Sequence, residues 1–258
     1  MGLSFQCASV LLALFTALAM EHISITELPE AGALKVRAPL QLEEVVTRMV
    51  KMNGQRAQAL AAYRGVRLYR LEYRGFGGAR SAEMAVDMKY ESPRTKEFTI
   101  LSQSGSKLLI DRVLKKLLQS EKEALGEENQ TRVALNADNY RFALLGYESR
   151  PAGSFYILGV EPQSSNKFLY RGRIWVDAED FAVMRVEAVP AKAPSFWTKE
   201  TKIEQVYSKI DGFWLPLVNR STSKIRLGGQ ASLTIEYQSY EITTALPLAH
   251  GTSSGTRP

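Results

Sequence analysis

The feature that most constrains the fold is a pair of strand-like segments joined by an acidic corner, within residues 167–190. In the first arm, residues 168–176, every second residue from Phe168 and Tyr170 onward forms one row. The residues between them, which include two arginines, form the other row. The second arm, residues 181–189, alternates in the same way. Successive side chains of a strand point to opposite faces, so this pattern predicts a two-stranded ribbon. The acid-rich residues 177–180 suit the turn because their side chains accept hydrogen bonds from nearby backbone amides.

Much of the remaining chain has the same strand-like character, with polar turns between the segments. Gly228-Gly229 is a strong hairpin signal because glycine adopts positive φ without strain. Repeated short strands with local turns predict an antiparallel meander. The predicted strands cover residues 65–73, 82–90, 97–103, 140–148, 154–161, 167–176, 181–189, 201–210, 214–224 and 231–243.

Two segments carry apolar residues at helical rather than strand spacing. Residues 39–63 start with Pro39, which suits a first helical turn, whereas the interior Gly54 costs roughly 1 kcal/mol relative to alanine. Residues 106–125 combine a leucine stripe with lysines on the other faces. This second segment predicts either a helix that packs on the sheet or a basic amphipathic helix that lies on a membrane or covers an apolar groove.

The start of the chain has the features of a secretory signal peptide over residues 1–19. Val10 to Met20 is an apolar run too short to cross a bilayer comfortably, and Ala17-Leu18-Ala19 has the small-x-small form of a cleavage site. No Lys or Arg precedes the run, so an uncleaved anchor or a different start codon is the alternative. Export of the remainder to the periplasm is expected. The expected mature chain has a lead-in over residues 20–38, one domain over residues 39–244 and a disordered tail over residues 245–258.

Few residues with catalytic or metal-binding chemistry fall inside the predicted domain. Cys7 is the only cysteine, and His22 and His250 are the only histidines, all outside it. Disulfides, cysteine nucleophiles, His-based metal sites and Ser–His–Asp sets are therefore excluded there. Asp177 and Glu179 have the chemistry of a glycosidase pair, but acids at a hairpin corner usually form the turn. The sequence predicts no catalytic residue, no metal and no cofactor.

The net charge of the chain does not by itself select one class of partner. The net charge of +6 fits contact with anionic lipid head groups, and it fits an ordinary solvated surface equally well. No dense block of lysine and arginine with interleaved aromatics occurs, so nucleic acid is not an expected partner.

Three stretches resemble the LolA/LolB/RseB superfamily of periplasmic carriers and sensors. RGRIWVDAEDFAVMRVE, residues 171–187, is similar to a hairpin of that superfamily with a tryptophan, an acidic turn and an R-x-E ending. KIDGFWLPLVNRSTS, residues 209–223, looks like its D-G-x-W-L-P strand start. NYRFALLGYES, residues 139–149, resembles bacterial outer-membrane lipoprotein-sorting-like proteins. The similarity covers roughly residues 39–243, and its motifs are of moderate specificity.

The resemblance implies a mostly β (α+β) fold. It would be a curved antiparallel half-barrel of about ten to eleven strands, with helices covering its concave face and enclosing an apolar cavity. In that superfamily LolA and LolB hold lipoprotein acyl chains, and RseB senses envelope stress. The expected function is a non-enzymatic periplasmic lipid or lipoprotein carrier. The alternative is an envelope sensor or adaptor that acts through protein–protein contacts.

Under the carrier reading, apolar side chains of the strands would line the cavity. Methionine and aromatic side chains adapt to irregular acyl chains, although each also suits ordinary core packing. The expected partners are acyl chains, with an envelope protein and peripheral membrane contact as further candidates. The expected lining residues are Met84, Val86, Met88, Phe98, Ile100, Tyr156, Leu158, Trp175, Phe196, Trp197 and Trp214.

Overall fold

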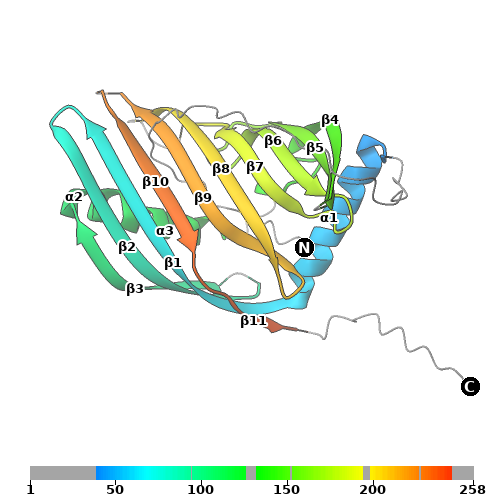
Figure 1. Cartoon of the computed structure of the whole chain (residues 1–258), viewed down its shortest axis with the longest axis horizontal. Helices are drawn as coiled ribbons and strands as arrows, with labels where there is room; N and C mark the ends of the chain where they lie inside the picture. The colour runs from blue at the N-terminus through cyan, green and yellow to red at the C-terminus, as the bar shows by residue number, and fades with distance from the viewer. Residues whose placement is uncertain are drawn as a thin grey trace, which may run out of the picture.

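The computed structural model describes residues 39–93, 95–125, 132–151, 153–193, 198–226 and 228–245. These residues form one antiparallel sheet of eleven strands with helical segments against it (Figure 1), so the mostly β (α+β) fold class is confirmed. The expected signal peptide and lead-in lie outside the described residues, as does the expected tail after residue 245. The strands are β1 (Leu60–Gly75), β2 (Gly78–Glu91), β3 (Thr95–Gly105), β4 (Tyr140–Arg150), β5 (Gly153–Pro162), β6 (Tyr170–Asp177), β7 (Val183–Pro190), β8 (Thr198–Ile210), β9 (Phe213–Ile225), β10 (Gln230–Tyr237) and β11 (Glu241–Thr244).

The strand order confirms the predicted meander and adds two long-range pairings of β1, one with β10 and one with β11. It runs β3-β2-β1-β10-β9-β8-β7-β6-β5-β4, and β11 pairs with the start of β1. Two runs of hairpins, β1–β3 and β4–β10, are joined because β1 pairs with β10, for example Leu71 with Leu233. Among the described strands, β3 and β4 form the two edges and do not meet. The sheet is therefore an open, curved half-barrel (Figure 1).

Helix α1 (Leu42–Ala59) packs against the part of the sheet formed by β4 to β7, at the right of Figure 1. Acidic residues in its first turn and a basic residue in its last turn suit the helix dipole. Its buried Val45 and Met49 contact the strands. The sequence predicted a helix over residues 39–63. The structure ends it at Ala59, because the backbone of Leu60 is extended (φ −85°, ψ 106°) and begins β1.

The second helical segment consists of α2 (Lys107–Leu109), the π-helical turn η1 (Ile110–Leu114) and α3 (Lys115–Ala124). We call this unit the cover. It lies over β1, β2 and β10, behind them at the left of Figure 1, so the prediction of a helix packed on the sheet is confirmed. No helix within the described ranges is long and apolar enough to cross a membrane. The side chains that the cover buries against the sheet are Leu109, Ile110, Leu114, Leu117 and Leu118.

The core lies on the face of the sheet beneath α1 and the cover, which we call the inner face. Its buried apolar residues form one cluster beneath α1, a second beneath the cover and a third near the start of β1. Strands β8 and β9 lie between the first two clusters in the strand order. The inner face is thus apolar at both sides and polar in the middle, because these two strands bury Thr201, Gln205, Asn219, Ser221 and Ser223.

The predicted strand over residues 231–243 is divided into β10 and β11. Between them Tyr240 donates its hydroxyl hydrogen bond to the backbone oxygen of Pro216 at 2.6 Å. Gly65 of β1 faces this break, where a Cβ atom would lie only 2.2 Å from the backbone oxygen of Ser239. Glycine at this position therefore permits the close approach of the two chains.

Candidate ligand-binding interior

Five of the expected lining residues are buried on the inner face, and the half-buried Phe98 packs against the clusters beneath the cover and near the start of β1. Met84 and Val86 of β2 are fully buried beneath the cover, and Met88 of the same strand belongs to the cluster near the start of β1. Tyr156 and Leu158 of β5 are buried beneath α1. The structure therefore brings Met84 and Val86 together, and separately Tyr156 and Leu158, on two sides of the polar middle.

Strand β3 carries two further expected residues at an edge of the sheet. Phe98 is half-buried, and its ring lies 5.8 Å from the Arg67 guanidinium carbon. Ile100 is 38% exposed. Phe196 and Trp197 lie outside the described residues.

The remaining two tryptophans occupy different environments. Trp175 of β6 lies on the outer face, because its strand neighbours on both sides are buried on the inner face. The guanidinium carbons of Arg173 and Arg185 lie 5.4 and 5.2 Å from its ring centroid. Trp214 is half-buried, and its Nε1 donates to the carboxylate of Asp180 at 2.8 Å. Trp175 is therefore not beside the residues buried under the helices.

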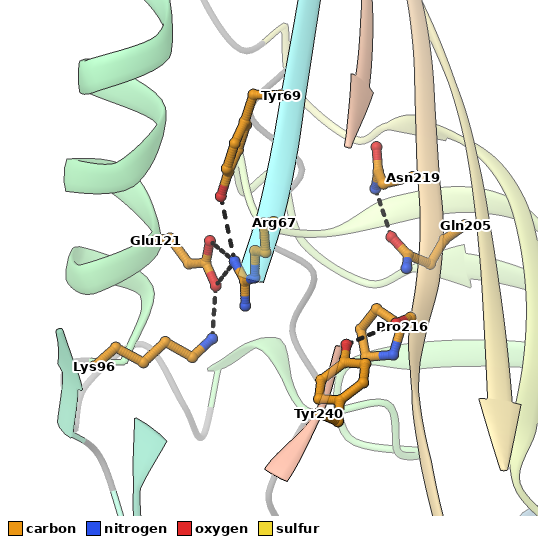
Figure 2. A network of polar contacts seen from close by, with 8 residues as sticks. All are labelled: Arg67, Tyr69, Lys96, Glu121, Gln205, Pro216, Asn219 and Tyr240. Carbon is orange, nitrogen blue, oxygen red and sulfur yellow. Dashed lines mark hydrogen bonds and ion pairs between the residues drawn. The ribbon is translucent and has the colours of Figure 1, made fainter. Parts of the chain in front are cut away.

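A buried group of three charges ties the cover to the sheet, and we call it the clasp (Figure 2). Glu121 of α3 accepts hydrogen bonds from Arg67 Nη1 of β1 at 2.9 and 3.0 Å. It also accepts one from Lys96 Nζ of β3 at 2.7 Å. The side chains of Arg67 and Lys96 are only 4% and 9% exposed. The clasp thus joins the cover to two strands through a single carboxylate.

The electrostatics of the clasp favour its charged state. Burial acts to raise the pKa of Glu121, but the ion pairs with Arg67 and Lys96 outweigh burial and lower it to about 2. Burial acts to lower the pKa of Lys96, and Glu121 more than offsets it, so that pKa is raised. All three groups are therefore charged at neutral pH, and each depends on the others for compensation.

The Arg67 guanidinium is only partly satisfied by the clasp. Its carbon lies 4.8 Å from the ring centroid of Tyr237, and its Nη1 also donates to the Tyr69 hydroxyl at 3.4 Å. Its Nε is buried and has no hydrogen-bond partner. An unsatisfied buried N–H group costs about 1–3 kcal/mol, so an incoming oxygen atom would be stabilised there. The inner face thus offers one strong polar donor among apolar side chains.

The polar middle of the inner face is satisfied internally. Asn219 Nδ2 donates to Gln205 Oε1 at 2.5 Å, a pair also drawn in Figure 2. The hydroxyls of Thr201 and Ser223 form a hydrogen bond, and Ser221 Oγ donates to a backbone oxygen of β10 at 3.5 Å. These bonds allow polar residues to be buried between two apolar clusters without the cost of unpaired groups.

The acidic corner, which includes the Asp177 and Glu179 pair, is a structural junction. Asp177 Oδ1 accepts hydrogen bonds from the backbone amides of Glu179 and Asp180 at 3.0 and 2.7 Å, which confirms the predicted turn role. Arg56 of α1 donates to the backbone oxygen of Asp180 at 2.8 Å. Burial acts to raise the pKa of Asp180, but hydrogen bonds, chiefly from Lys209, outweigh it and lower that pKa. Within the described ranges no three His, Cys, Asp or Glu side chains group to hold a metal ion.

The outer face carries a groove of about 930 Å³ that spans β4 to β9. Its charges are largely paired within the sheet. Arg185 contacts Glu187 and Glu204 at 2.6 and 2.9 Å, and Arg220 contacts Glu204 at 3.4 Å. Half-exposed pairs of this kind contribute about 0–1 kcal/mol each and are typical of a solvated sheet face. The groove therefore offers little uncompensated charge to a ligand.

Solved structures of other proteins resemble this chain only distantly. No family model and no curated protein matches the chain. A putative outer membrane lipoprotein-sorting protein domain from Vibrio parahaemolyticus is similar at 11% identity and a TM-score of 0.43, over 79% of this chain and 92% of that one. A DUF1329 family protein from Desulfovibrio piger is similar at 13% identity and a TM-score of 0.41, over 80% and 94%. A LolA superfamily protein from Nitrosomonas europaea is similar at 12% identity and a TM-score of 0.34, over 80% and 94%. These are distant likenesses of fold, and none of them assigns a role to this chain.

Proposed function

We propose that the protein binds acyl chains of a lipid or lipoprotein on the inner face, beneath the cover, and carries this ligand in the periplasm without enzymatic chemistry. The observation that supports it most directly is the construction of the interior. An apolar sheet face is closed by an amphipathic segment that is tied to it through one buried carboxylate, Glu121.

The chemistry of the contact between cover and sheet suits an acyl chain. Leucine and isoleucine side chains of the cover pack on Met84 and Val86, so the sheet face already binds branched aliphatic groups. Methylene groups of an acyl chain have the same apolar character, and burying each one is worth about 0.8 kcal/mol. An acyl ligand would take the place of the cover's side chains as the cover moves away from the sheet.

The clasp supports the same proposal from the polar side. Arg67 lies at the border of the apolar cluster, and its Nε–H is buried without a partner. The ester or amide oxygen at the head of an acyl chain is a suitable acceptor for that group. The interior thereby suits an amphiphile with an apolar body and an oxygen-rich end.

Photo-crosslinking locates the site. The protein is incubated with a palmitic acid that carries a diazirine, irradiated, and the adducts are mapped by mass spectrometry. The proposal predicts adducts on β1, β2 and the cover, around Met84 and Val86. Adducts confined to the outer face around Trp175, or no adduct above that of a soluble diazirine without an acyl chain, would contradict it.

The alternative function is an envelope sensor or adaptor that acts through protein contacts. Two observations favour it. The inner-face clusters are filled by the chain's own side chains, and the edge strand β3 exposes Ile100 at 38% and Leu101 at 56%. An exposed edge strand can accept a strand from a partner. This alternative predicts no acyl adduct and a stoichiometric protein partner whose binding is lost in Leu101→Lys.

A further inference from the structure

The clasp holds more positive than negative charge. It consists of two cations, Arg67 and Lys96, and one carboxylate, Glu121, so its net charge is +1. The side chain of Glu121 is 15% exposed, and those of the two cations are exposed even less. In the part of the chain that the structure describes, Arg67 and Lys96 form no ion pair with another carboxylate. An excess charge held away from water is unfavourable, and a further anion would compensate it.

The hydrogen-bond donors of Arg67 are not fully used by Glu121. Both carboxylate oxygens accept from the same guanidinium nitrogen, Nη1. A guanidinium presents five N–H groups in a planar fork, and an oxyanion in the bidentate arrangement accepts from two of its nitrogens. The Nε of Arg67 is buried without a hydrogen-bond partner. The clasp therefore has the chemistry of an oxyanion site, and its present occupant leaves a donor unpaired.

The clasp adjoins the apolar surface beneath the cover. Arg67 is the direct cross-strand neighbour of Val86 in β2, and Val86 is paired in turn with Ile100 in β3. Directly paired side chains lie on the same face of a sheet, so these three residues form one row on the inner face. Val86 is fully buried, whereas Ile100 at the edge is 38% exposed. An acyl chain that lies along this row would place its head group at the guanidinium of Arg67.

Glu121 is the member of the clasp that belongs to the cover, whereas Arg67 and Lys96 belong to the sheet. In the proposed function the cover moves away from the sheet to admit an acyl chain, and Glu121 moves with it. The two cations then remain on the inner face without their counter-charge. A ligand that brings an oxyanion compensates them, and a ligand with a neutral head group does not.

We propose that the clasp is a head-group site, in which an oxyanion of the ligand replaces the Glu121 carboxylate on Arg67 and Lys96. The ligand is then an anionic amphiphile, and Glu121 occupies the place of its head group when no ligand is bound. The carboxylate of a fatty acid and the phosphate of an anionic phospholipid both supply this chemistry. The apolar half of this inference rests on the proposed acyl-binding function, whereas the oxyanion half rests on the clasp.

Isothermal titration calorimetry tests the proposal with three probes that share a dodecyl chain length and differ in head group: dodecanoate, dodecyl phosphate and neutral monododecanoylglycerol, each below its critical micelle concentration. Acetate and inorganic phosphate are titrated as anions without a chain. The parent protein is compared with Lys96→Met, which brings the net charge of the clasp to zero, and with Glu121→Gln, which raises it to +2 and removes the competing carboxylate. The matched control is Glu123→Gln, at an exposed position of the same helix.

The affinity for the anionic probes relative to the neutral probe should rise in the order Lys96→Met, parent, Glu121→Gln. The two variants should differ in this ratio by about tenfold or more, and Glu123→Gln should match the parent. A loosened cover in Glu121→Gln raises the affinity for all three probes alike, so the ratio isolates the head-group site. The comparison of Lys96→Met with the parent remains decisive if Glu121→Gln is unfolded at the assay temperature.

The outcomes separate the head-group site from the acyl site. With the expected order, tighter binding of dodecanoate than of dodecyl phosphate identifies a fatty acid as the source of the oxyanion, and the reverse identifies a phospholipid. The same ratio of anionic to neutral binding throughout the series would overturn the head-group site and retain acyl binding. Binding of acetate or inorganic phosphate to Glu121→Gln, without binding of any dodecyl probe, would retain the oxyanion site and remove the acyl-binding function. No binding of any anion, with or without a chain, would overturn the head-group site.

Discussion

Replacing Glu121 by glutamine should lower the free energy of unfolding by about 3 kcal/mol, because it removes the only carboxylate of the clasp. The pKa of Glu121 lies at about 2 instead of 4.5. A difference of that size corresponds to about 3 kcal/mol of stabilisation at neutral pH. Breaking a buried ion pair by removing one partner costs about 3–5 kcal/mol, which agrees in magnitude. Arg67 and Lys96 would be left almost buried without a counter-charge.

The measurement is urea unfolding followed by circular dichroism at pH 7, combined with hydrogen exchange of residues 107–124. Asp111→Asn is the matched control, because Asp111 forms an exposed ion pair with Lys115 one helical turn away. Such pairs contribute about 0.3–0.5 kcal/mol. Glu121→Gln should unfold at lower urea and exchange faster in the cover. A loss no larger than that of Asp111→Asn would refute the assigned role of the clasp.

The pH dependence of the same variant gives a second test. Because the folded pKa of Glu121 is below its ordinary value, its stabilisation is fully present above about pH 4.5. It is lost as the pH falls from there towards about 2. The difference in stability between the parent and Glu121→Gln should therefore narrow across this window. A difference that stays constant down to pH 3 would contradict the ionic origin of the effect.

Two further predictions concern the elements that frame the interior. Gly105→Ala should destabilise the protein by about 1–3 kcal/mol, because φ is +88° there and a Cβ would lie 2.3 Å from the backbone oxygen of Ser81. Gly54→Ala in α1 should instead stabilise the protein by up to about 1 kcal/mol, because a Cβ there would meet open space. Thermal melts of the two variants check the opposite signs. Leu114→Ala, which truncates a fully buried residue of the cover, should cost about 2–5 kcal/mol in urea unfolding. Leu108→Ala, at a 55% exposed position of the same segment, should cost much less, and equal losses would contradict the packing described.

Local pattern was sufficient to predict most of the elements. Alternation within residues 167–190 predicted the hairpin that became β6 and β7, and the turn chemistry of Asp177 matched its amide hydrogen bonds. The pairing of β1 with β10 was not predictable in this way, because no local feature links segments so far apart in the sequence. The break before β11 depends on a contact of Tyr240 with another strand, which is equally non-local.

The clasp was missed, although the sequence contains a signal for it. Arg67 lies on the same face of β1 as Tyr63, Tyr69 and Leu71, which are all buried on the inner face. A charged residue within an apolar row of a strand predicts a buried charge that requires a partner. The identity of the partner could not be inferred, because Glu121 reaches Arg67 only through the packing of the cover. The place of Trp175, by contrast, can be inferred from its position in the strand. Its neighbours on both sides in β6 are buried on the inner face, so Trp175 itself points to the outer face.

Native mass spectrometry of the protein purified from a bacterial periplasm, followed by organic extraction of any bound molecule, tests whether the protein binds acyl chains. We expect a chain that begins at Met20 and carries one bound phospholipid or acylated peptide, released on extraction. A clean mass of the chain alone, with no uptake when phosphatidylglycerol is added, would contradict acyl binding and favour the adaptor function.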